Sequence, residues 1–292
     1  MRKIAFLSMD DLTHFVSDDL LAEPFLQELG WEVDLVSWRN QSVVWEHYEA
    51  VIIRTTWDYQ DDLPSFLTAL AQIESKTCLA NPLEVVRWNA DKKYLRELES
   101  KGINIVPTRW GESISSEDEI LQMFVELDSR EIVVKPNVSA NADSTFRLTL
   151  DSSLISEAVR AFANREYMVQ PFMDRIIDEG EYSLFYLNGE YSHAILKTPK
   201  AHDFRVQEEH GGLIQPYVPT EQQLLVGANV MRLAPPDLLY ARVDLVRDTN
   251  DDFALMELEL VEPALYLRMS ENAPALFANA VDNFLDRRLS LS

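Results

Sequence analysis

An acidic hairpin near the end of the chain constrains the fold more than any other stretch. From Tyr240 it reads YARVDLVRDTNDDFALMELELVEP, so two apolar runs flank a turn rich in Asp, Asn and Thr. Alternation of apolar and polar residues with a period of two predicts two antiparallel strands. If the turn is TNDD, Asp244 faces Glu257 across the hairpin and Arg242 faces Glu259.

The predicted pairing brings carboxylates of neighbouring strands to within about 5 Å of each other. Such groups repel unless a cation lies between them or one of them takes a proton. A hard divalent cation such as Mg²⁺, which prefers oxygen ligands, would relieve the repulsion. The alternative is a solvated outer face, which is common in acidic chains. The same alternation assigns Phe253 and Leu255 to the face of Glu257 and Glu259.

Composition and charge narrow the classes of partner. The chain has 292 residues, of which 47 % are hydrophobic and 26 % charged, as expected for a globular protein with two or three subdomains. Its net charge of −23 argues against nucleic acid or an anionic membrane as a partner, because both need a basic surface. Cys78 is the single cysteine, which excludes a disulfide framework and a thiolate metal cluster. Since the sequence contains no signal peptide or membrane-spanning run, we expect a cytoplasmic location.

The N-terminal part of the chain has the pattern of a parallel α/β sheet. Three strand-like apolar runs precede Arg54, and a helical pattern that stops at Gly30 separates the first two. Parallel sheets bind ligands beyond the carboxyl ends of their strands, and the segment RTTWDY follows the third run. Arg54 would either hold a substrate carboxylate there or form a surface salt bridge. The candidate substrate residues are Arg54, Thr55, Thr56 and Asp58.

Two stretches in the middle of the chain carry candidate anion-binding groups. Asn89 is the predicted N-cap of a helix that ends at Gly102 and has Lys92 in its first turn. A cation is unfavourable there unless an anion binds at the helix N-terminus or solvent screens the charge. Further on, the strand-like run EIVVKP contains Lys135 and leads into NVSANADSTF. The hydroxyl and main-chain N–H groups of this glycine-free loop could cover phosphates, although such loops are often simple turns.

The second half of the chain contains a further hairpin and a polar loop. Asn188 and Gly189, between two alternating runs, are a strong hairpin signal. The polar segment TPKAHDFRVQEEHGG follows Lys197, carries Arg205 and ends in two glycines. These properties are typical of a loop that lies over a binding site.

The order of these pieces resembles the ATP-grasp superfamily, and within it the glutathione synthetase-like and D-alanyl-D-alanine ligase-like enzymes. The matching pieces are DKKYL with GINIVPT, VVKP, QPFM with GEYSL, DFR with GG, and ARVDL with LMELELVEP. RTTWDY, NPLEVVRWN, SANADSTFRL and SHAILKTP also resemble the narrower group around the O-ureido-D-serine cyclo-ligase of the cycloserine pathway. The resemblance implies an α/β fold with an N-terminal parallel-sheet domain at residues 1–88 and two ATP-grasp subdomains, 89–168 and 169–292, that enclose ATP.

The resemblance also implies a role for each matched residue. Nucleotide-binding residues would be Lys92 and Lys135 at the phosphates, the backbone of Gln170, Pro171, Phe172 and Met173 at the adenine, and Glu181 or the nearby Glu179 at the ribose, with Ser139, Ser144, Thr145 and Lys197 close by. Asp244, Glu257 and Glu259 would hold Mg²⁺, with two ions expected and Mn²⁺ able to substitute. Arg205 would be the catalytic residue that stabilises charge on the transferring phosphoryl group.

Two features depart from the family pattern. The loop after Lys135 lacks the glycines that many relatives have, and Glu259 stands where many relatives have a metal-binding Asn. The first change could stiffen the closure of the loop, and the second adds negative charge and should tighten metal binding.

The resemblance implies ATP-dependent activation of a carboxylate, followed by attack of an amine to form an amide. Three functions remain open at this point: a ligase that joins two small amino-acid or peptide substrates, an intramolecular cyclo-ligase, and a nucleotide-binding regulatory protein without turnover. Related enzymes are often dimers, so a homodimer is an expectation as well.

Overall fold

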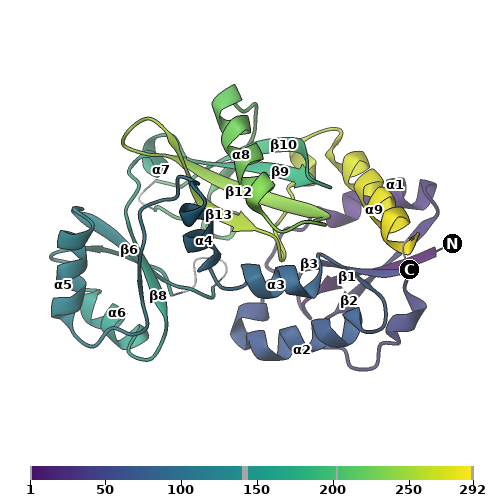
Figure 1. Ribbon diagram of the computed structural model, residues 1–292, viewed down its shortest axis with the longest axis horizontal. Helices are drawn as coiled ribbons and strands as arrows, with labels where there is room; N and C mark the ends of the chain where they lie inside the picture. Colours follow the sequence, from purple (N-terminus) through teal and green to yellow (C-terminus); the bar gives the residue numbers. More distant parts are fainter. Residues whose placement is uncertain (1, 140–143, 202, 291–292) are drawn as a thin grey trace.

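The computed structural model describes residues 2–139, 144–201 and 203–290, and three β-sheets form its framework (Figure 1). The loop predicted to cover phosphates is therefore described at residues 137–139 and 144–145, and His202 of the polar loop lies outside the described residues. None of the helices in these ranges is long and apolar enough to span a membrane.

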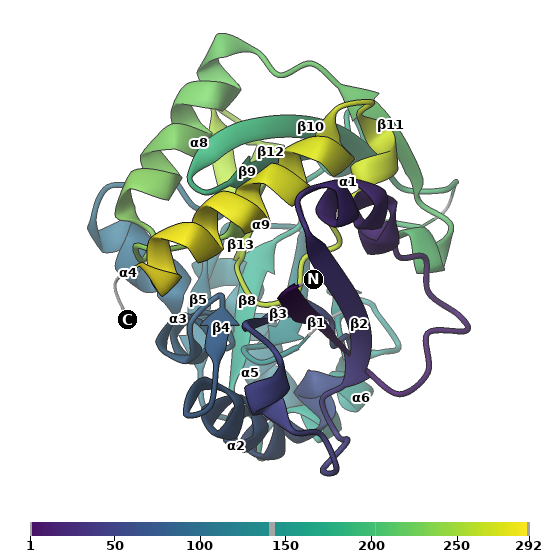
Figure 2. The same cartoon turned by 90° about the vertical axis from the view of Figure 1, so that its right-hand side faces the viewer.

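The first sheet is parallel and is covered on both faces, as the N-terminal pattern predicted. One face packs against α1 (Glu23–Glu28) and α9 (Ala273–Leu289), and the other against α2 (Leu63–Glu74) and α3 (Leu83–Asn89). Figure 2 shows α9 lying across the molecule between α1 and the strands β9 and β10. The C-terminal helix therefore joins the first sheet to the third. In spatial order the strands are β2 (Trp31–Ser37), β1 (Arg2–Ser8), β3 (Ala50–Thr55) and β4 (Cys78–Ala80).

The second sheet is antiparallel and forms a separate lobe with its own apolar core, at the left of Figure 1. Helices α5 (Glu117–Glu126) and α6 (Ile155–Ala161) pack on one face of it. Ser116 caps α5 by accepting a hydrogen bond from the main-chain N–H of Glu119. The strands, in spatial order, are β5 (Arg109–Gly111), β8 (Tyr167–Pro171), β6 (Glu131–Pro136) and β7 (Phe146–Thr149).

The third sheet is also antiparallel and contains both predicted hairpins. Asn188 and Gly189 adopt positive φ angles of 51° and 83°, as the two-residue turn between β9 and β10 requires. Helices α4 (Tyr94–Ser100) and α8 (Glu221–Leu233) pack on one face, and a capping box of Thr220 and Gln223 begins α8. The strands, in spatial order, are β11 (Leu213–Tyr217), β10 (Glu190–Thr198), β9 (Glu181–Leu187), β12 (Tyr240–Arg247) and β13 (Phe253–Glu259).

Short helices complete the described chain. They are η1 (Asp19–Ala22), η2 (Trp45–His47), η3 (Tyr59–Asp62), α7 (Arg175–Asp178), η4 (Glu208–His210) and η5 (Leu267–Met269). The parallel first sheet followed by two antiparallel sheets confirms the predicted fold class. The predicted domain boundaries stay a prediction.

The acidic hairpin pairs as predicted at its carboxylates, with Asp244 opposite Glu257 and Arg242 opposite Glu259. Two deviations from the simple hairpin cancel to give this result. Because Arg247 pairs with Phe253, the turn is one residue longer than TNDD. A bulge between the pairs of Leu245 and Asp244 then leaves Met256 without a partner on β12. Beyond the bulge the original register returns.

The bulge corrects the predicted faces of β13. Phe253 and Leu255 pack in the core that contains Leu258 and Leu260, on the face opposite the glutamates. Ala254 and Met256 pack in a different apolar cluster, with Met173 and other residues near the cleft described below. Strict alternation fails because an extra residue in one strand inverts the side-chain directions that precede it.

Asn89 is not a helix N-cap. It is the last residue of α3, and α4 begins only at Tyr94, so Lys92 lies between two helices instead of in a first turn. The Asn89 side chain donates to the carbonyl of Leu258 at 2.7 Å and accepts from the N–H of Leu260 at 2.8 Å. Since β13 is an edge strand, these bonds satisfy backbone groups that no further strand pairs with.

Candidate functional site

One cleft gathers most of the residues predicted to act on a nucleotide. It contains about 1510 Å³ of space, part of it open to solvent, and is lined by strand residues of the second and third sheets and by Trp57 and Tyr59, which follow the first sheet. The predicted residues that line it are Lys92, Lys135, Ser139, Thr145, Gln170, Pro171, Phe172, Met173, Glu181, Lys197, Arg205, Asp244, Glu257 and Glu259. The fold therefore brings together groups that are more than 160 positions apart in the sequence.

The candidate substrate residues after β3 do not line the cleft. Arg54 is fully buried, so it is neither open to a substrate nor a surface ion pair. Its guanidinium donates twice to one oxygen of Asp19, at 2.9 and 3.1 Å, and also to the carbonyl of Pro263. Thr55 and Thr56 are buried as well. The residues at the end of β3 are therefore packed inside the fold, which the sequence alone does not reveal.

Two further predicted residues are engaged elsewhere. Asp58 accepts a hydrogen bond from the indole of Trp38 at 2.8 Å and pairs with Arg39. The hydroxyl of Ser144 accepts a bond from Arg165 at 3.1 Å, and Ser144 is not among the lining residues. Arg54, Thr55, Thr56, Asp58 and Ser144 are therefore the predicted site residues that the structure does not bring into the cleft.

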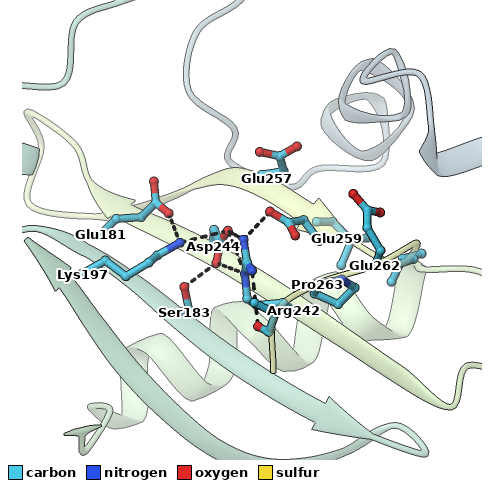
Figure 3. A network of polar contacts seen from close by, with 12 residues as sticks. Glu181, Ser183, Lys197, Arg242, Asp244, Glu257, Glu259, Glu262 and Pro263 are labelled. Atoms are coloured by element: carbon cyan, nitrogen blue, oxygen red, sulfur yellow. Dashed lines mark hydrogen bonds and ion pairs between the residues drawn. The ribbon is translucent and has the colours of Figure 1, made fainter. Parts of the chain in front are cut away.

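Four carboxylates from the acidic hairpin and the residues after it form one wall of the cleft, which we call the acidic floor. They are Asp244, Glu257, Glu259 and Glu262. Figure 3 shows their side chains projecting from β12, β13 and the segment after β13.

Asp244 is the most strongly held member of the floor. Arg242 donates hydrogen bonds to both carboxylate oxygens of Asp244 at 2.9 to 3.1 Å. The hydroxyl of Ser183 donates to Asp244 at 2.5 Å, and the Lys197 ammonium lies 3.3 Å from the carboxylate. Burial alone would raise the pKa of Asp244, but the two cations outweigh it and keep this pKa below its usual range. Arg242 and Lys197 therefore favour the ionised form of Asp244.

Glu257 and Glu259 differ from each other in their electrostatic surroundings. The Lys92 ammonium lies 3.0 Å from Glu257, and together with Lys135 it holds the pKa of Glu257 low against the effect of burial. Glu259 pairs with Arg242, yet burial and the neighbouring acids raise its pKa to about 7. More negative charge is thus concentrated here than the surrounding cations neutralise.

Glu262 is the most weakly compensated acid of the floor. Its carboxylate makes no hydrogen bond or ion pair with any residue that the structure describes, and Figure 3 shows it without a dashed line. Burial, and then the charge of Glu259, raise its pKa to about 8.

Cationic and hydroxyl groups face the floor from other elements, and we call Lys92, Lys135 and Arg205 the basic cover. The Lys92 ammonium donates to the carbonyl of Ser139 at 2.7 Å, which ties the loop after β6 to the floor. Lys135 comes from β6, and burial lowers its pKa while Glu257 opposes the shift. Arg205 donates to Asp203, two residues away, at 2.9 and 3.1 Å.

The remaining end of the cleft is apolar and offers main-chain groups. Met173, Ile176, Val206 and Met256 belong to one small cluster, and all four line the cleft. Between the two glutamates that the sequence left open, Glu181 lines the cleft and pairs with Lys197, whereas Glu179 is engaged by Arg247 and Arg175 and is not a lining residue. A flat apolar ring with polar edges would fit this end.

Comparison with protein families identifies the fold that carries this cleft. A family model described as the prokaryotic glutathione synthetase ATP-grasp domain matches residues 104–269. The chain belongs to this ATP-grasp family. A second model, described as the N-terminal domain of D-cycloserine synthetase DcsG, matches residues 4–81.

Individual relatives agree with the family assignment. The cycloserine biosynthesis protein DcsG of Streptomyces lavendulae is 28 % identical over 278 residues, which cover 87 % of this chain and 89 % of that protein. The crystal structure of D-cycloserine synthetase DcsG superposes with a TM-score of 0.83 at 27 % identity, covering 97 % and 99 % of the two chains. D-alanine–D-alanine ligase from Bacillus anthracis shares the fold, with a TM-score of 0.68 at 14 % identity over 100 % and 98 %. The protein is an ATP-grasp ligase, which binds ATP and forms carbon-nitrogen bonds.

The acidic floor has the donor chemistry for a magnesium ion but is not a closed cage. Among the described residues, no three carboxylate, histidine or cysteine side chains converge as a metal site would require. Asp244 is already occupied by Arg242, Lys197 and Ser183. Mg²⁺ typically takes one or two carboxylates together with substrate phosphates, so an ATP-grasp floor that becomes complete only with bound nucleotide fits this ion.

Sequence reasoning missed several cleft residues. Trp57 and Tyr59 line the cleft, although only their neighbours in the segment RTTWDY were predicted to bind a substrate. Arg242 was recognised only as a cross-strand partner of Glu259, although it also lines the cleft. Glu262 offered a signal, since it continues the acidic series just before Pro263.

Proposed function

We propose that the protein is an ATP-dependent carboxylate-amine ligase that acts on small amino-acid or peptide substrates through an acyl phosphate. One observation carries the proposal: the acidic floor and the basic cover face each other across a single cleft of an ATP-grasp ligase. A metal-bound triphosphate needs both kinds of group, because its metal seeks carboxylates and its oxygens seek cations.

In this proposal the nucleotide lies with its base at the apolar end of the cleft. The main chain of residues 170–173 would contact the adenine, and Glu181 would accept hydrogen bonds from the ribose. Lys92 and Lys135 would bind phosphate oxygens, and Ser139, Thr145 and Lys197 would lie nearby. The support is that all of these residues line the same cleft as the acidic floor.

Three members of the acidic floor, Asp244, Glu257 and Glu259, would hold Mg²⁺. Glu257 and Glu259 would be the protein ligands nearest to the phosphates, and Asp244 would join them by giving up part of its contact with Arg242 or Lys197. Two ions would account for all three carboxylates, and Mn²⁺ would substitute because it accepts the same oxygen ligands. Bound there, the metal would neutralise charge on the phosphate oxygens.

The reaction needs no nucleophile from the protein, which contributes by positioning the substrate carboxylate and ATP. A carboxylate oxygen of the first substrate attacks the γ-phosphorus of ATP, the bond to the bridging oxygen breaks, and ADP leaves with the electron pair. Arg205 and Arg242 would stabilise negative charge on the phosphoryl group and on the acyl phosphate. An amine then attacks the acyl carbon, inorganic phosphate leaves, and the nitrogen loses a proton to give the amide.

An intramolecular version of the reaction is the second candidate. It is favoured by one observation: the match to DcsG extends through the N-terminal sheet, which is the part of the chain outside the ATP-grasp model. In a cyclo-ligase the carboxylate and the amine belong to one molecule, so a single substrate would yield a ring and ADP.

The experiment is to measure ADP release with Mg²⁺ and ATP against amino acids, dipeptides and O-substituted serine derivatives, each alone and in pairs. Turnover that requires a pair establishes the intermolecular ligase. Turnover with one compound, together with a product lighter than its substrate by one water, establishes the cyclo-ligase. ATP binding without ADP release across the panel would instead support the regulatory alternative and contradict the proposal.

A further inference from the structure

The segment after β13, residues 260–265, is held by side chains to an unusual degree, and we call it the exit segment. Each of its six successive main-chain carbonyls lies within hydrogen-bond distance of a side-chain donor. The donors, in order from residue 260 to residue 265, are Asn81 at 2.8 Å, Tyr240 at 2.9 Å, Trp57 at 2.9 Å, Arg54 at 2.8 Å, Arg242 at 3.4 Å and His193 at 2.9 Å. No regular secondary structure could satisfy these carbonyls, so the surrounding fold does so instead.

This arrangement fixes the backbone on both sides of Glu262. Three of the donors, Asn81, Trp57 and Arg54, come from the N-terminal sheet and the loops at its end. With its main chain immobilised, Glu262 points its carboxylate to the side on which Glu257 and Glu259 project (Figure 3). The carboxylate is thus preorganised, although no described residue binds it.

Tyr59 lies at the same end of the cleft. Its side chain is only 5 % exposed, it lines the cleft, and its hydroxyl makes no hydrogen bond with the described residues. Tyr59 lies two positions after Trp57, whose indole donates to the carbonyl of Glu262 at 2.9 Å, and both Tyr59 and Glu262 line the cleft. A phenol oxygen and a carboxylate together form an acceptor set for a small cation with several N–H donors.

We infer that Glu262 and Tyr59 form a subsite for a primary ammonium group of the substrate, which would make the substrate a small amino acid or a derivative with a free ammonium. The inference rests on the proposed function and deepens it by naming a recognition group. An ammonium has three N–H donors and one positive charge, so it would supply both the hydrogen bonds and the neutralising charge that Glu262 lacks.

The position of Glu262 favours an ammonium over a third metal ion. Trp57 binds the main chain of Glu262, so this end of the cleft is built by the N-terminal sheet. Within the basic cover, Lys92 forms its ion pair with Glu257 and not with Glu262. In nucleotide sites Mg²⁺ is usually bound by one or two carboxylates together with substrate phosphates, whereas an ammonium can bind a carboxylate without any phosphate.

A binding experiment tests the subsite without requiring turnover. The protein is loaded with Mg²⁺ and the non-hydrolysed analogue AMPPNP, and then titrated calorimetrically with D- and L-alanine, D- and L-serine, and the N-acetyl derivative of each. The variants are Glu262→Gln, Tyr59→Phe and, as a matched control, Glu190→Gln at the exposed tip of the β9–β10 hairpin. Thermal unfolding verifies that each variant is folded.

We expect at least one free amino acid to bind the wild-type protein about tenfold or more tightly than its N-acetyl form, because a charge-assisted hydrogen bond is lost on acetylation. This preference should fall to within about twofold in Glu262→Gln, fall partly in Tyr59→Phe, and persist in Glu190→Gln. AMPPNP affinity and its Mg²⁺ dependence should stay unchanged in Glu262→Gln.

Three results would overturn the inference. The first is an undiminished preference of Glu262→Gln for the free over the N-acetylated amino acid. The second is loss, in Glu262→Gln, of the Mg²⁺ dependence of AMPPNP binding. The third is failure of every free amino acid to bind the AMPPNP-loaded wild-type protein. Failure of the proposed function is distinguishable, because it would appear as absence of AMPPNP binding or of ADP release.

Discussion

The two sides of the cleft are built in different ways. The acidic floor belongs to a hairpin and an exit segment, and the exit segment is held by hydrogen bonds from residues 21 to 209 positions away along the chain. The basic cover is held more sparsely: Arg205 bonds to Asp203, two residues away, and Lys135 makes no ion pair within the described part of the chain. The floor is preorganised for like charges, whereas the cations of the cover have few contacts, of which the pair between Arg205 and Asp203 is local in sequence.

This difference follows from the cost of keeping carboxylates together. Neighbouring acids repel, so a floor that carries four of them must be fixed by contacts elsewhere. The cations of the cover need no such support, because the floor itself attracts them, as the contact between Lys92 and Glu257 illustrates. We therefore expect substitutions that remove the contacts fixing the floor to lower the free energy of unfolding. Substitutions of charged side chains that line the cleft should instead reduce nucleotide binding or turnover.

The largest effect should come from Arg54, the buried link between the N-terminal sheet and the exit segment. Arg54→Met leaves the buried carboxylate of Asp19 without its partner and frees the carbonyl of Pro263, so the free energy of unfolding should fall by about 3 to 5 kcal/mol. Urea denaturation measures this. Arg39→Met, which removes a partly exposed ion pair with Asp58, is the control and should cost about 1 kcal/mol or less. An equal loss of unfolding free energy in the two variants would mean that the link through Arg54 supports the fold no more than a partly exposed ion pair does.

His193 should make the exit segment sensitive to acid. Burial lowers the pKa of His193 to about 4 from 6.5, and its ring contacts the carbonyl of Leu265. The folded state therefore favours the neutral ring, so the contribution is complete above about pH 6.5 and is lost as pH falls toward 4, by about 3 kcal/mol in total.

Denaturation curves between pH 4 and pH 7 test this contribution. His193→Gln keeps a neutral polar group, so its stability should fall less steeply over this range than that of the wild-type protein. Parallel curves for the two proteins would mean that His193 is not a pH-sensitive support of the exit segment.

Glu257 tests the chemistry of the floor. Glu257→Gln removes a predicted metal ligand while keeping the size of the side chain, so ADP release should fall about 100-fold or more, equivalent to about 2.7 kcal/mol, with little change in stability. Glu157→Gln, at an exposed position on α6, serves as the control. Unchanged turnover in Glu257→Gln would contradict the metal assignment.

Lys135 tests the cover and should give the smallest of these effects. Lys135→Ala should weaken ATP binding about tenfold, or about 1.4 kcal/mol, because one phosphate contact is lost. Calorimetric titration with ATP measures the change, and Lys76→Ala on the surface is the control. If Lys135→Ala bound ATP with unaltered affinity, the cover would have no role in phosphate binding.

The sequence predicted the floor well because local rules govern a hairpin. Alternation and turn chemistry place Asp244 opposite Glu257, although the longer turn and the bulge at Met256 each shift the register by one residue. Only their cancellation preserved the pairing. The faces of Phe253 and Leu255 were wrong for the same reason, since no sequence rule locates a bulge.

Residues defined by long-range packing could not be predicted in this way. Arg54 looked available for a substrate, but its role depends on Asp19 and on a carbonyl 209 positions away. Asn89 resembled a helix cap, yet its amide serves the edge of β13. Trp57 and Tyr59 reach the cleft only because the first sheet meets the exit segment there.

The most direct test of the account is whether the floor couples metal to nucleotide. Calorimetric titration of ATP into the wild-type protein, with and without Mg²⁺, should show affinity that is about tenfold or more higher with the metal. In Glu257→Gln that gain should largely disappear, while metal-free ATP affinity stays the same or rises, because a repelling charge has been removed. An equal Mg²⁺-dependent gain in both proteins would contradict the account.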